Sequence, residues 1–366
     1  MIIHLIAAAR PNFMKIAPLY HALKREDWAH PVIVHTGQHY DMNMSDSFFE
    51  DFSLPAPDIH LGVGSGTHAE QTGRVLMRYE GVLFEKRPDL VVVVGDVNST
   101  MAATIAATKL GILVAHLEAG LRSFDRSMPE EINRLVTDAL ADILWTPSPD
   151  ADENLIKEGI PQHRIQRVGN IMIDSLELMR EKINAASMTN HLGLEPGKYG
   201  LVTLHRPSNV DDPEKLRSIC DLLAKVGREI DLVFPVHPRT RKNLEKAGLA
   251  PVLEKASGVH CVEPMRYIPF MNLVFNGRFV ITDSGGIQEE TTYLGIPCMT
   301  LRPNTERPIT IHQGTNRLCT LEDIEEKLRK ALNGRAGEHR PPEFWDGRTA
   351  GRVVESIRSI DRTEIV

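Results

Sequence analysis

The 366-residue sequence has little cysteine and no surplus of positive charge. Its four cysteines are widely spaced, so they indicate neither a CxxC metal site nor a disulfide framework, and buried thiols are the simpler interpretation. The formal net charge of −7 argues against a nucleic-acid-binding protein, which normally has a basic surplus. The apolar start MIIHLIAAARP has no basic leader and no room for a membrane span. We therefore expect a buried first strand there, in a soluble cytoplasmic protein with no nucleic-acid or membrane partner.

The composition, with 42% hydrophobic and 25% charged residues, is that of a globular protein. The length allows two cores of roughly 150–200 residues each. Short β-rich runs alternate with helix-length segments such as residues 42–52, 99–111 and 131–141, a pattern typical of parallel βα units in an α/β protein. The runs expected to be strands are residues 2–8, 31–36, 90–96, 112–118 and 141–148 in the first half, and 200–210, 231–238, 258–264, 278–286 and 297–303 in the second.

The two series of strands predict two domains. A helical connector that closes in a Gly- and Pro-containing loop separates them, so we expect an N-terminal domain of residues 1–170 and a C-terminal domain of residues 171–348. A final helix, about residues 349–362, has no strand after it and is expected to pack back on the first domain.

Polar side chains follow many of the predicted strands. Ligands of open α/β sheets bind beyond the carboxyl ends of the strands, so these positions are the first candidates for a site. For any one of these residues, a purely structural role is about as frequent as a functional one. The functional interpretation therefore rests on how many such residues occur together. The residues at these positions are Arg10, Asp96, His116 and Glu118 in the first half, and His205, Arg206, His237, Asp283 and Ser284 in the second.

The segment ITDSGGIQEET, residues 281–291, predicts a strand that ends in a tight turn and opens a helix. A helix N-terminus with glycines suits a phosphate, because free N–H groups point at the ligand and the backbone can approach it closely. Glu289 and Glu290 follow about one turn later. They could accept hydrogen bonds from hydroxyl groups beside the phosphate, or they could be ordinary first-turn acids that favour the helix dipole.

Motifs along nearly the whole chain resemble those of the non-hydrolysing UDP-N-acetylglucosamine 2-epimerases. The similar segments are ARPNFMKIAPL, TGQH, VVGDVNST, HLEAGLRS, PEEINR, LHRPSN, PVHP, ITDSGGIQEET, GIP and TERP followed by GTN. The resemblance implies a GT-B-type architecture, in which two Rossmann-like, doubly wound parallel-sheet domains face a central cleft, and a homodimer. It also implies interconversion of UDP-N-acetylglucosamine and UDP-N-acetylmannosamine, which supplies N-acetylmannosamine for cell-surface polysaccharide synthesis.

The same resemblance implies where UDP binds. The pyrophosphate would meet Ser284, Gly285 and Gly286, and Glu290 would bind the ribose diol, since one carboxylate can accept two charge-assisted hydrogen bonds. Arg307 would be a second polar contact to the nucleotide. Phe270 would form a wall near the uracil, although it could equally be a core residue.

The resemblance implies catalysis by elimination. No oxidising-cofactor motif is present, because the glycines of GSGTHAEQTG do not close a strand, so we expect no cofactor and no metal. UDP would leave from C1 to give 2-acetamidoglucal and would then add back. The family's catalytic residues correspond to Asp96, Glu118, Glu130 and His205, and its charged substrate contacts to Arg10, Lys15, Arg134 and His237. Alternatively, Lys15 could be a solvated helix residue and Arg134 an ordinary i,i+4 partner of Glu130.

Many bacterial members bind a second, activating UDP-N-acetylglucosamine. The matching positions here are Gln38, Arg74, Glu131 and Arg206, together with His237. The surroundings depart from the family pattern at Asp41 and at the Pro–Ser pair after Arg206, so we expect weak activation. Asn12 also replaces a carboxylate that is usual at its position.

Other functions fit the same motifs. A glycosyltransferase could share the fold and the glycine turn, but it would need an acceptor site and has no use for three carboxylates. A hydrolysing relative would release UDP and free N-acetylmannosamine, and a sensor would bind without turnover. The sequence also leaves open a related UDP-sugar of the 3-acetamido uronic acid type.

Overall fold

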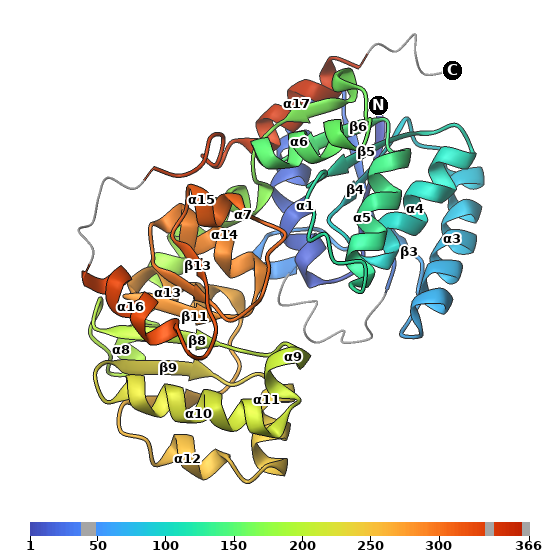
Figure 1. The fold of residues 1–366 in the computed structure, drawn as a ribbon. Helices are drawn as coiled ribbons and strands as arrows, with labels where there is room; N and C mark the ends of the chain where they lie inside the picture. The colour runs from blue at the N-terminus through green and yellow to red at the C-terminus, as the bar shows by residue number, and fades with distance from the viewer. Residues whose placement is uncertain (38–48, 334–339, 361–366) are drawn as a thin grey trace. The chain divides into compact units, whose positions relative to one another are not determined.

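The protein's computed structural model describes residues 1–37, 49–333 and 340–360 (Figure 1). Contacts divide the chain into two compact units, Met1–Leu178 with Glu343–Val366, and Met179–Pro342. The division falls inside helix α7 (Ile171–Ala185), whereas the sequence pattern placed the boundary near residue 170. No helix of these described ranges is long and apolar enough to cross a membrane.

The first unit is built on a seven-stranded parallel sheet with the order β3-β2-β1-β4-β5-β6-β7. Its strands are β1 (Ile2–Ala7), β2 (His30–His35), β3 (Ile59–His60), β4 (Leu90–Val94), β5 (Leu113–Leu117), β6 (Ile143–Thr146) and β7 (Ile165–Arg167). Strand β4 is wholly buried, as expected for a central parallel strand with the uninterrupted apolar sequence LVVVV.

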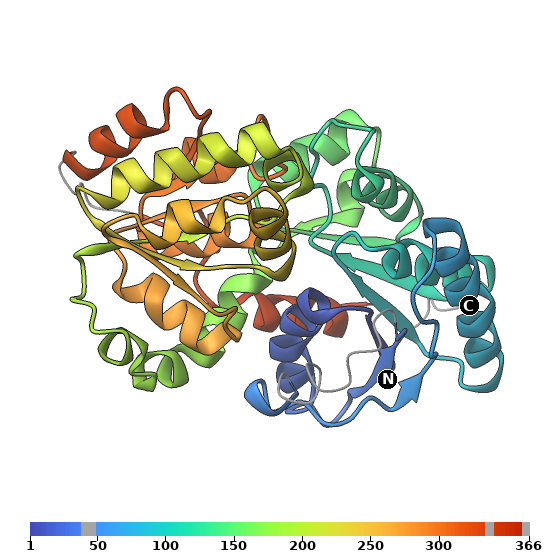
Figure 2. The same ribbon diagram turned by 90° about the horizontal axis from the view of Figure 1, so that it is seen from below.

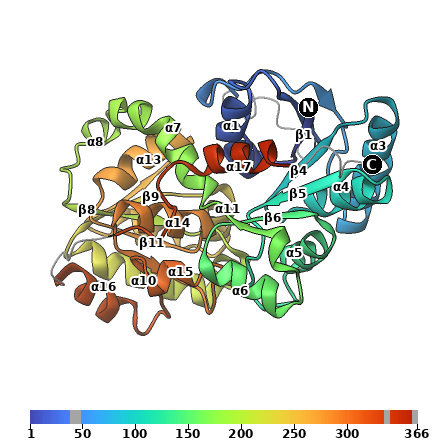
Figure 3. The same cartoon turned by 90° about the horizontal axis from the view of Figure 1, so that it is seen from above.

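Helices cover both faces of this sheet. They are α1 (Arg10–Leu23), α3 (His68–Glu85), α4 (Asn98–Lys109), α5 (Pro129–Leu140), α6 (Pro149–Lys157), the 3₁₀ helix η1 (Gln162–Arg164), α7 and α17 (Thr349–Arg358). Helices α3 and α4 pack against each other (Figure 2). The final helix α17 packs on α1 (Figure 3), and Ser356 accepts a hydrogen bond of 2.8 Å from the Trp145 indole.

The second unit has a six-stranded parallel sheet with the order β10-β9-β8-β11-β12-β13. Its strands are β8 (Tyr199–Thr203), β9 (Asp231–Pro235), β10 (Val259–Val262), β11 (Phe279–Thr282), β12 (Cys298–Thr300) and β13 (Asn316–Leu318). Its helices are α8 (Met188–His191), α9 (Pro207–Val210), α10 (Pro213–Gly227), α11 (Pro238–Lys246), α12 (Ala250–Glu254), α13 (Tyr267–Asn276), α14 (Gly285–Leu294), α15 (Ile309–His312) and α16 (Ile324–Asn333).

These elements confirm the predicted α/β class with two doubly wound parallel sheets. Every apolar run expected to be a strand contains one. The short strands β3, β7 and β13 were not predicted, because each has only two or three residues and no apolar run. Most of the helix expected at residues 42–52 lies outside the described residues.

The order of strands reverses once in each sheet, between β1 and β4 in the first and between β8 and β11 in the second. A crevice forms at such a switch point, because the connections of the two flanking strands turn to opposite faces of the sheet. The loops that leave β1, β4, β8 and β11 carry most of the polar residues singled out in the sequence.

Candidate active site

Helix α1 is fixed to the switch point of the first sheet by Asn12. Its side-chain amide donates to the Val94 carbonyl at 3.0 Å, and its side-chain oxygen accepts from the Ala9 backbone at 3.1 Å. Asn12 is almost wholly buried, so the residue that departs from the family pattern has a positional role here. Arg10 is the first residue of α1, and its side chain lies outside the described part of the structure.

Lys15 in the second turn of α1 and Glu118 just after β5 form a buried ion pair. The alternative that Lys15 is a solvated helix residue is therefore wrong, because its ammonium group is enclosed and faces a carboxylate. Gly95 lines the same place with φ +66°, and a Cβ there would lie 2.9 Å from the Lys15 Nζ. Glycine at this position lets the β4 loop pass the ion pair.

Asp96 follows Gly95 and pairs with Arg134 of α5. The Arg134 side chain is 4% exposed, whereas that of Asp96 is 28% exposed, so the carboxylate is the partner that a solute can reach. Arg134 also contacts Glu131 at 2.8 Å, which makes Glu131 its helix partner at i,i+3. Asn133 donates to the Asp96 carbonyl at 2.8 Å and holds the loop in place.

Glu131 is buried, and its carboxylate is hydrogen-bonded to other residues of the protein. Its carboxylate accepts from the backbone of Ser123 and Phe124, both at 2.9 Å, and from the Ser123 hydroxyl at 3.0 Å. Its neighbour Glu130 is half-buried and has no hydrogen-bond or ion-pair partner among the described residues. The Arg74 guanidinium lies at the surface and donates to two loop carbonyls. Gln38 lies outside the described residues.

A buried network of hydrogen bonds and ion pairs connects β5, the loop after β4 and helix α5. His116 contacts the Gly95 carbonyl at 2.8 Å and Asp138 at 2.6 Å, and Arg122 pairs with Asp138 at 2.7 Å. Burial opposes ionisation of Asp138, but His116 and Arg122 hold its pKa below its usual value. His116 is fully buried, so it supports the site without reaching a ligand. Nothing in the sequence pattern indicated Asp138 or Arg122.

In the second unit, Asp283 ties the β8 loop to the end of β11. Its buried carboxylate accepts from the backbone of Arg206 at 2.9 Å and of His205 at 3.1 Å, and from the Asn209 amide at 3.1 Å. The His205 Nδ1 lies 3.3 Å from the same carboxylate. The sequence placed Asp283 at a strand end but gave it no role, and the structure makes it the residue that orients His205.

His205 and His237 lie beside each other at the ends of β8 and β9. Their ring centroids are 5.3 Å apart, and His237 accepts a hydrogen bond of 3.2 Å from the Arg239 backbone at the start of α11. Burial lowers the pKa of His237, and the nearby His205 and Arg239 lower it further. Both side chains remain accessible, since the His205 side chain is 37% exposed and His237 is exposed.

The turn at Ser284 is open to a ligand. Ser284 is the N-cap of α14, yet its hydroxyl makes no capping hydrogen bond. A Cβ at Gly286 would meet nothing within 4 Å, whereas one at Gly285 would lie 2.9 Å from both Arg307 and Glu306. Gly286 therefore leaves space at the helix N-terminus, and Gly285 makes room for the arginine.

Arg307 belongs to a buried row of alternating charges. It contacts Glu289 at 2.9 Å and Glu306 at 2.5 Å, and Glu306 in turn contacts Arg302 at 2.9 Å. Burial opposes ionisation of Glu306, but the Arg307 and Arg302 guanidinium groups hold its pKa well below its usual range. The interpretation of Glu289 as an ordinary first-turn acid that favours the helix dipole is wrong, because α14 begins at Gly285, its first turn holds no acidic residue, and Glu289 is buried against Arg307.

Glu290 and Phe270 lie on neighbouring helices of the second unit, α14 and α13. The buried Glu290 carboxylate accepts a hydrogen bond of 2.8 Å from the Tyr267 hydroxyl. Phe270 is half-buried, so part of its ring is exposed. In the residues that the structure describes, no group of three or more His, Cys, Asp or Glu side chains is arranged to hold a metal ion.

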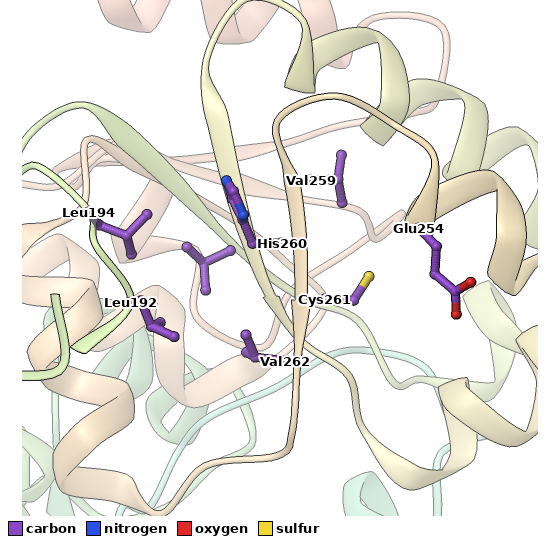
Figure 4. A pocket seen from close by; sticks show the side chains of 8 residues that line it. Leu192, Leu194, Glu254, Val259, His260, Cys261 and Val262 are labelled. Carbon is purple, nitrogen blue, oxygen red and sulfur yellow. The ribbon is translucent and has the colours of Figure 1, made fainter. Parts of the chain in front are cut away.

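Two of the cavities formed by the described residues lie in the second unit. One of about 400 Å³ lies at the edge strand β10, where Leu192 and Leu194 line one side and Cys261 and Glu254 the other (Figure 4). The second, of about 540 Å³, is formed by the loops after β8, β12 and β13. Neither is lined by the Ser284 turn, by His205 or by Glu290.

Comparisons with known proteins agree on one family. A family model described as UDP-N-acetylglucosamine 2-epimerase matches residues 21–358. A UDP-N-acetylglucosamine 2-epimerase of Methanocaldococcus jannaschii is 42% identical over 98% of this chain and 99% of its own. A UDP-2,3-diacetamido-2,3-dideoxy-D-glucuronate 2-epimerase of Pseudomonas aeruginosa is 38% identical over 97% of this chain and 99% of its own. A crystal structure of the M. jannaschii UDP-GlcNAc 2-epimerase in complex with UDP-GlcNAc and UDP superposes with a TM-score of 0.88, at 39% identity over 98% of this chain and 99% of that one.

Proposed function

Because the chain belongs to the UDP-N-acetylglucosamine 2-epimerase family, we propose that it interconverts UDP-N-acetylglucosamine and UDP-N-acetylmannosamine by eliminating and re-adding UDP. The observation that carries this proposal is the pair of carboxylates at the ends of the neighbouring strands β4 and β5. Asp96 and Glu118 are each held by a cation, Arg134 and Lys15. Carboxylates fixed in this way can move protons at defined positions on a bound sugar.

The elimination needs a base, and it needs positive charge at the leaving group. As the C1–O bond breaks, its electron pair leaves with UDP. A carboxylate takes the C2 proton, and the C–H electron pair forms the C1=C2 bond of 2-acetamidoglucal. Return of a proton to the other face of C2, with re-addition of UDP, inverts that carbon. Asp96, Glu118 and Glu130 are the proposed acids and bases, because a cluster of carboxylates can supply both a base and a protonated acid.

The departing diphosphate requires fixed donors. We assign the pyrophosphate to Ser284, Gly285 and Gly286, where α14 directs its free N–H groups outward. Glu290 binds the ribose and Phe270 flanks the uracil. The proposed contacts of the substrate site are the cations Arg10, Lys15, Arg134 and Arg307 and the imidazoles of His205 and His237. Preorganised charge and donors of this kind stabilise a leaving group without reorganisation.

Asp283 acts through His205 and is therefore a positioning residue. It accepts hydrogen bonds from two consecutive backbone amides and lies 3.3 Å from the His205 Nδ1, which leaves the Nε2 as the outward nitrogen. An imidazole held in this orientation can face the diphosphate, as the family resemblance implies for this histidine.

Incubation with UDP-N-acetylglucosamine, followed by NMR of the anomeric protons, tests the proposal. We expect a mixture of the two UDP-sugars without added NAD or metal. Free N-acetylmannosamine and UDP would instead indicate a hydrolysing enzyme, and binding without conversion would indicate a sensor. Transfer of the sugar to an acceptor would indicate a glycosyltransferase.

The Pseudomonas relative supports a second candidate substrate, the UDP-2,3-diacetamido uronate in its name. Measuring kcat/KM for both sugars with the same preparation decides between them. The homodimer and the supply of N-acetylmannosamine for polysaccharide synthesis remain predictions from the resemblance. Sedimentation equilibrium checks the homodimer.

A further inference from the structure

The cavity of about 540 Å³ has a defined polar and apolar lining. Its walls come from Ser208, Asn209 and Lys215 around α9 and α10, from Leu301–Pro303 after β12, and from Cys319–Glu322 after β13. Its volume of about 540 Å³ lies within the range of small-molecule sites. None of the residues assigned above to the sugar or to UDP lines it.

The charged groups of this cavity favour an anion. Lys215 donates to the Ser208 carbonyl at 2.8 Å, and an ammonium group has three donors, so two have no partner among the described residues. The opposing acid is Glu322, which lies exposed at the rim and shares a hydrogen bond with Thr320. Arg302 is already paired with Glu306, so Lys215 is the cation of this lining that has donors available to an occupant.

Arg302 supplies the second argument. It is 5% exposed, and its Nη2 donates to Glu306 at 2.9 Å. Its Nη1 is buried and has no hydrogen-bond partner in residues 1–37, 49–333 and 340–360. A buried guanidinium N–H without an acceptor is costly, so an arginine that lines a cavity in this state points to an occupant that accepts hydrogen bonds.

The rest of the lining is apolar. Leu301, Pro303 and Leu321 give the occupant a hydrophobic surface, and the Cys319 thiol is buried beside them. An inorganic ion alone would leave this surface uncovered. We propose that the cavity binds a small organic anion, in which a phosphate or carboxylate group faces Lys215 and Arg302 and an apolar group faces Leu301, Pro303 and Leu321.

The position of Asn209 connects this site to His205. Its amide donates to the Leu301 carbonyl at 2.9 Å and to Asp283 at 3.1 Å, and Asp283 holds the His205 backbone. An occupant that contacts Asn209 therefore touches the group that fixes the Asp283 carboxylate. If the proposed function holds, occupation of the cavity changes turnover, and the site is regulatory.

Calorimetric titration of the whole protein tests the site with two probes, phenyl phosphate and phenylacetate. The protein is first saturated with UDP, which occupies the proposed nucleotide site. We expect one probe to bind with one-to-one stoichiometry and Lys215→Met to weaken it at least tenfold. The matched control is Lys225→Met, which removes another α10 lysine that pairs with Glu325 at 2.7 Å and does not line the cavity.

Failure of both probes to bind at millimolar concentration, or equal affinity in wild type and Lys215→Met, would overturn the proposed site. At a saturating concentration of the probe, turnover should change at least twofold in the wild type and remain unchanged in Lys215→Met. An unchanged wild-type turnover rate would overturn the proposed link through Asn209. A chain that does not bind UDP contradicts the proposed function instead. The probe titration without UDP then still decides whether the cavity is a binding site.

Discussion

At the scale of single residues, the environments of Glu118 and Glu290 differ in the partner that each carboxylate faces. Glu118 faces the Lys15 ammonium, whereas Glu290 accepts from the Tyr267 hydroxyl. The first arrangement suits a group that exchanges protons beside a cation, and the second suits a fixed hydrogen-bond acceptor. We therefore assign Glu118 to the chemistry at the sugar and Glu290 to the nucleotide.

Glu118→Gln should lower kcat at least ~10²-fold, the usual scale for a general acid or base, and leave the affinity for UDP unchanged. Glu290→Ala should instead weaken UDP, because the ribose loses its acceptor. Tyr267→Phe is the comparison variant, since it removes the hydroxyl that donates to Glu290 and leaves the carboxylate in place. Rate measurements with UDP calorimetry separate the effects, and the reverse pattern would refute this division of roles.

The sequence predicted which residues lie at the carboxyl ends of the strands but not which partners they take. Asp96, Glu118, His205 and Ser284 follow apolar runs, so the pattern of strands was enough to locate them. The pairing of Glu289 with Arg307 and the support of His116 by Asp138 depend on elements brought together by folding. No spacing in the sequence encodes such contacts.

At the scale of elements, α14 begins with two glycines, one closely surrounded by side chains and the other beside open space. A Cβ at Gly285 would meet Arg307 and Glu306 at 2.9 Å, so Gly285→Ala should displace Arg307 and lower the melting temperature. Gly286→Ala meets nothing within 4 Å and should keep the wild-type melting temperature, yet it should weaken UDP by filling the space at the helix N-terminus. Thermal unfolding and UDP titration of both variants check this, and equal melting temperatures would contradict it.

Strand β5 and helix α5 are joined by the buried Asp138, whose pKa is held low in the folded protein. A carboxyl group with a depressed folded pKa stabilises the fold above its unfolded pKa, near 3.9, and this contribution is lost as the pH falls through the folded value. Asp138→Asn should lower the free energy of unfolding at pH 7 by about 3–5 kcal/mol, since it leaves His116 without its carboxylate and Arg122 with Glu158 alone.

Denaturant unfolding at pH 7 and at pH 3 measures this effect. The difference between wild type and Asp138→Asn should shrink at pH 3. Asp125→Asn is the control, because Asp125 is half-buried and its carboxylate accepts from the nearby Ser127, far from the Asp138 network in the contacts it makes. Wild-type stability of Asp138→Asn at pH 7 would show that the network does not support the sheet.

At the scale of the whole molecule, the positions expected to bind a second, activating UDP-sugar depart from the family pattern directly after Arg206. Both carboxylate oxygens of Glu131 are occupied by the chain, and Pro207 and Ser208 follow Arg206. We therefore expect trace UDP-N-acetylglucosamine to speed conversion of UDP-N-acetylmannosamine by less than about tenfold, a coupling near ~1.4 kcal/mol. Reverse-direction progress curves measure it, and complete inactivity until the activator is added would show an intact second site.

The central claim is that the C2 proton is removed and replaced during epimerisation. Conversion of UDP-N-acetylglucosamine in deuterated water, with the anomeric and C2 positions followed by NMR, tests it most directly. Elimination with protonation by Asp96, Glu118 or Glu130 predicts deuterium at C2 in the product, because a carboxyl proton taken up from deuterated water is a deuteron. A product that keeps its C2 hydrogen in deuterated water at full conversion would contradict the account.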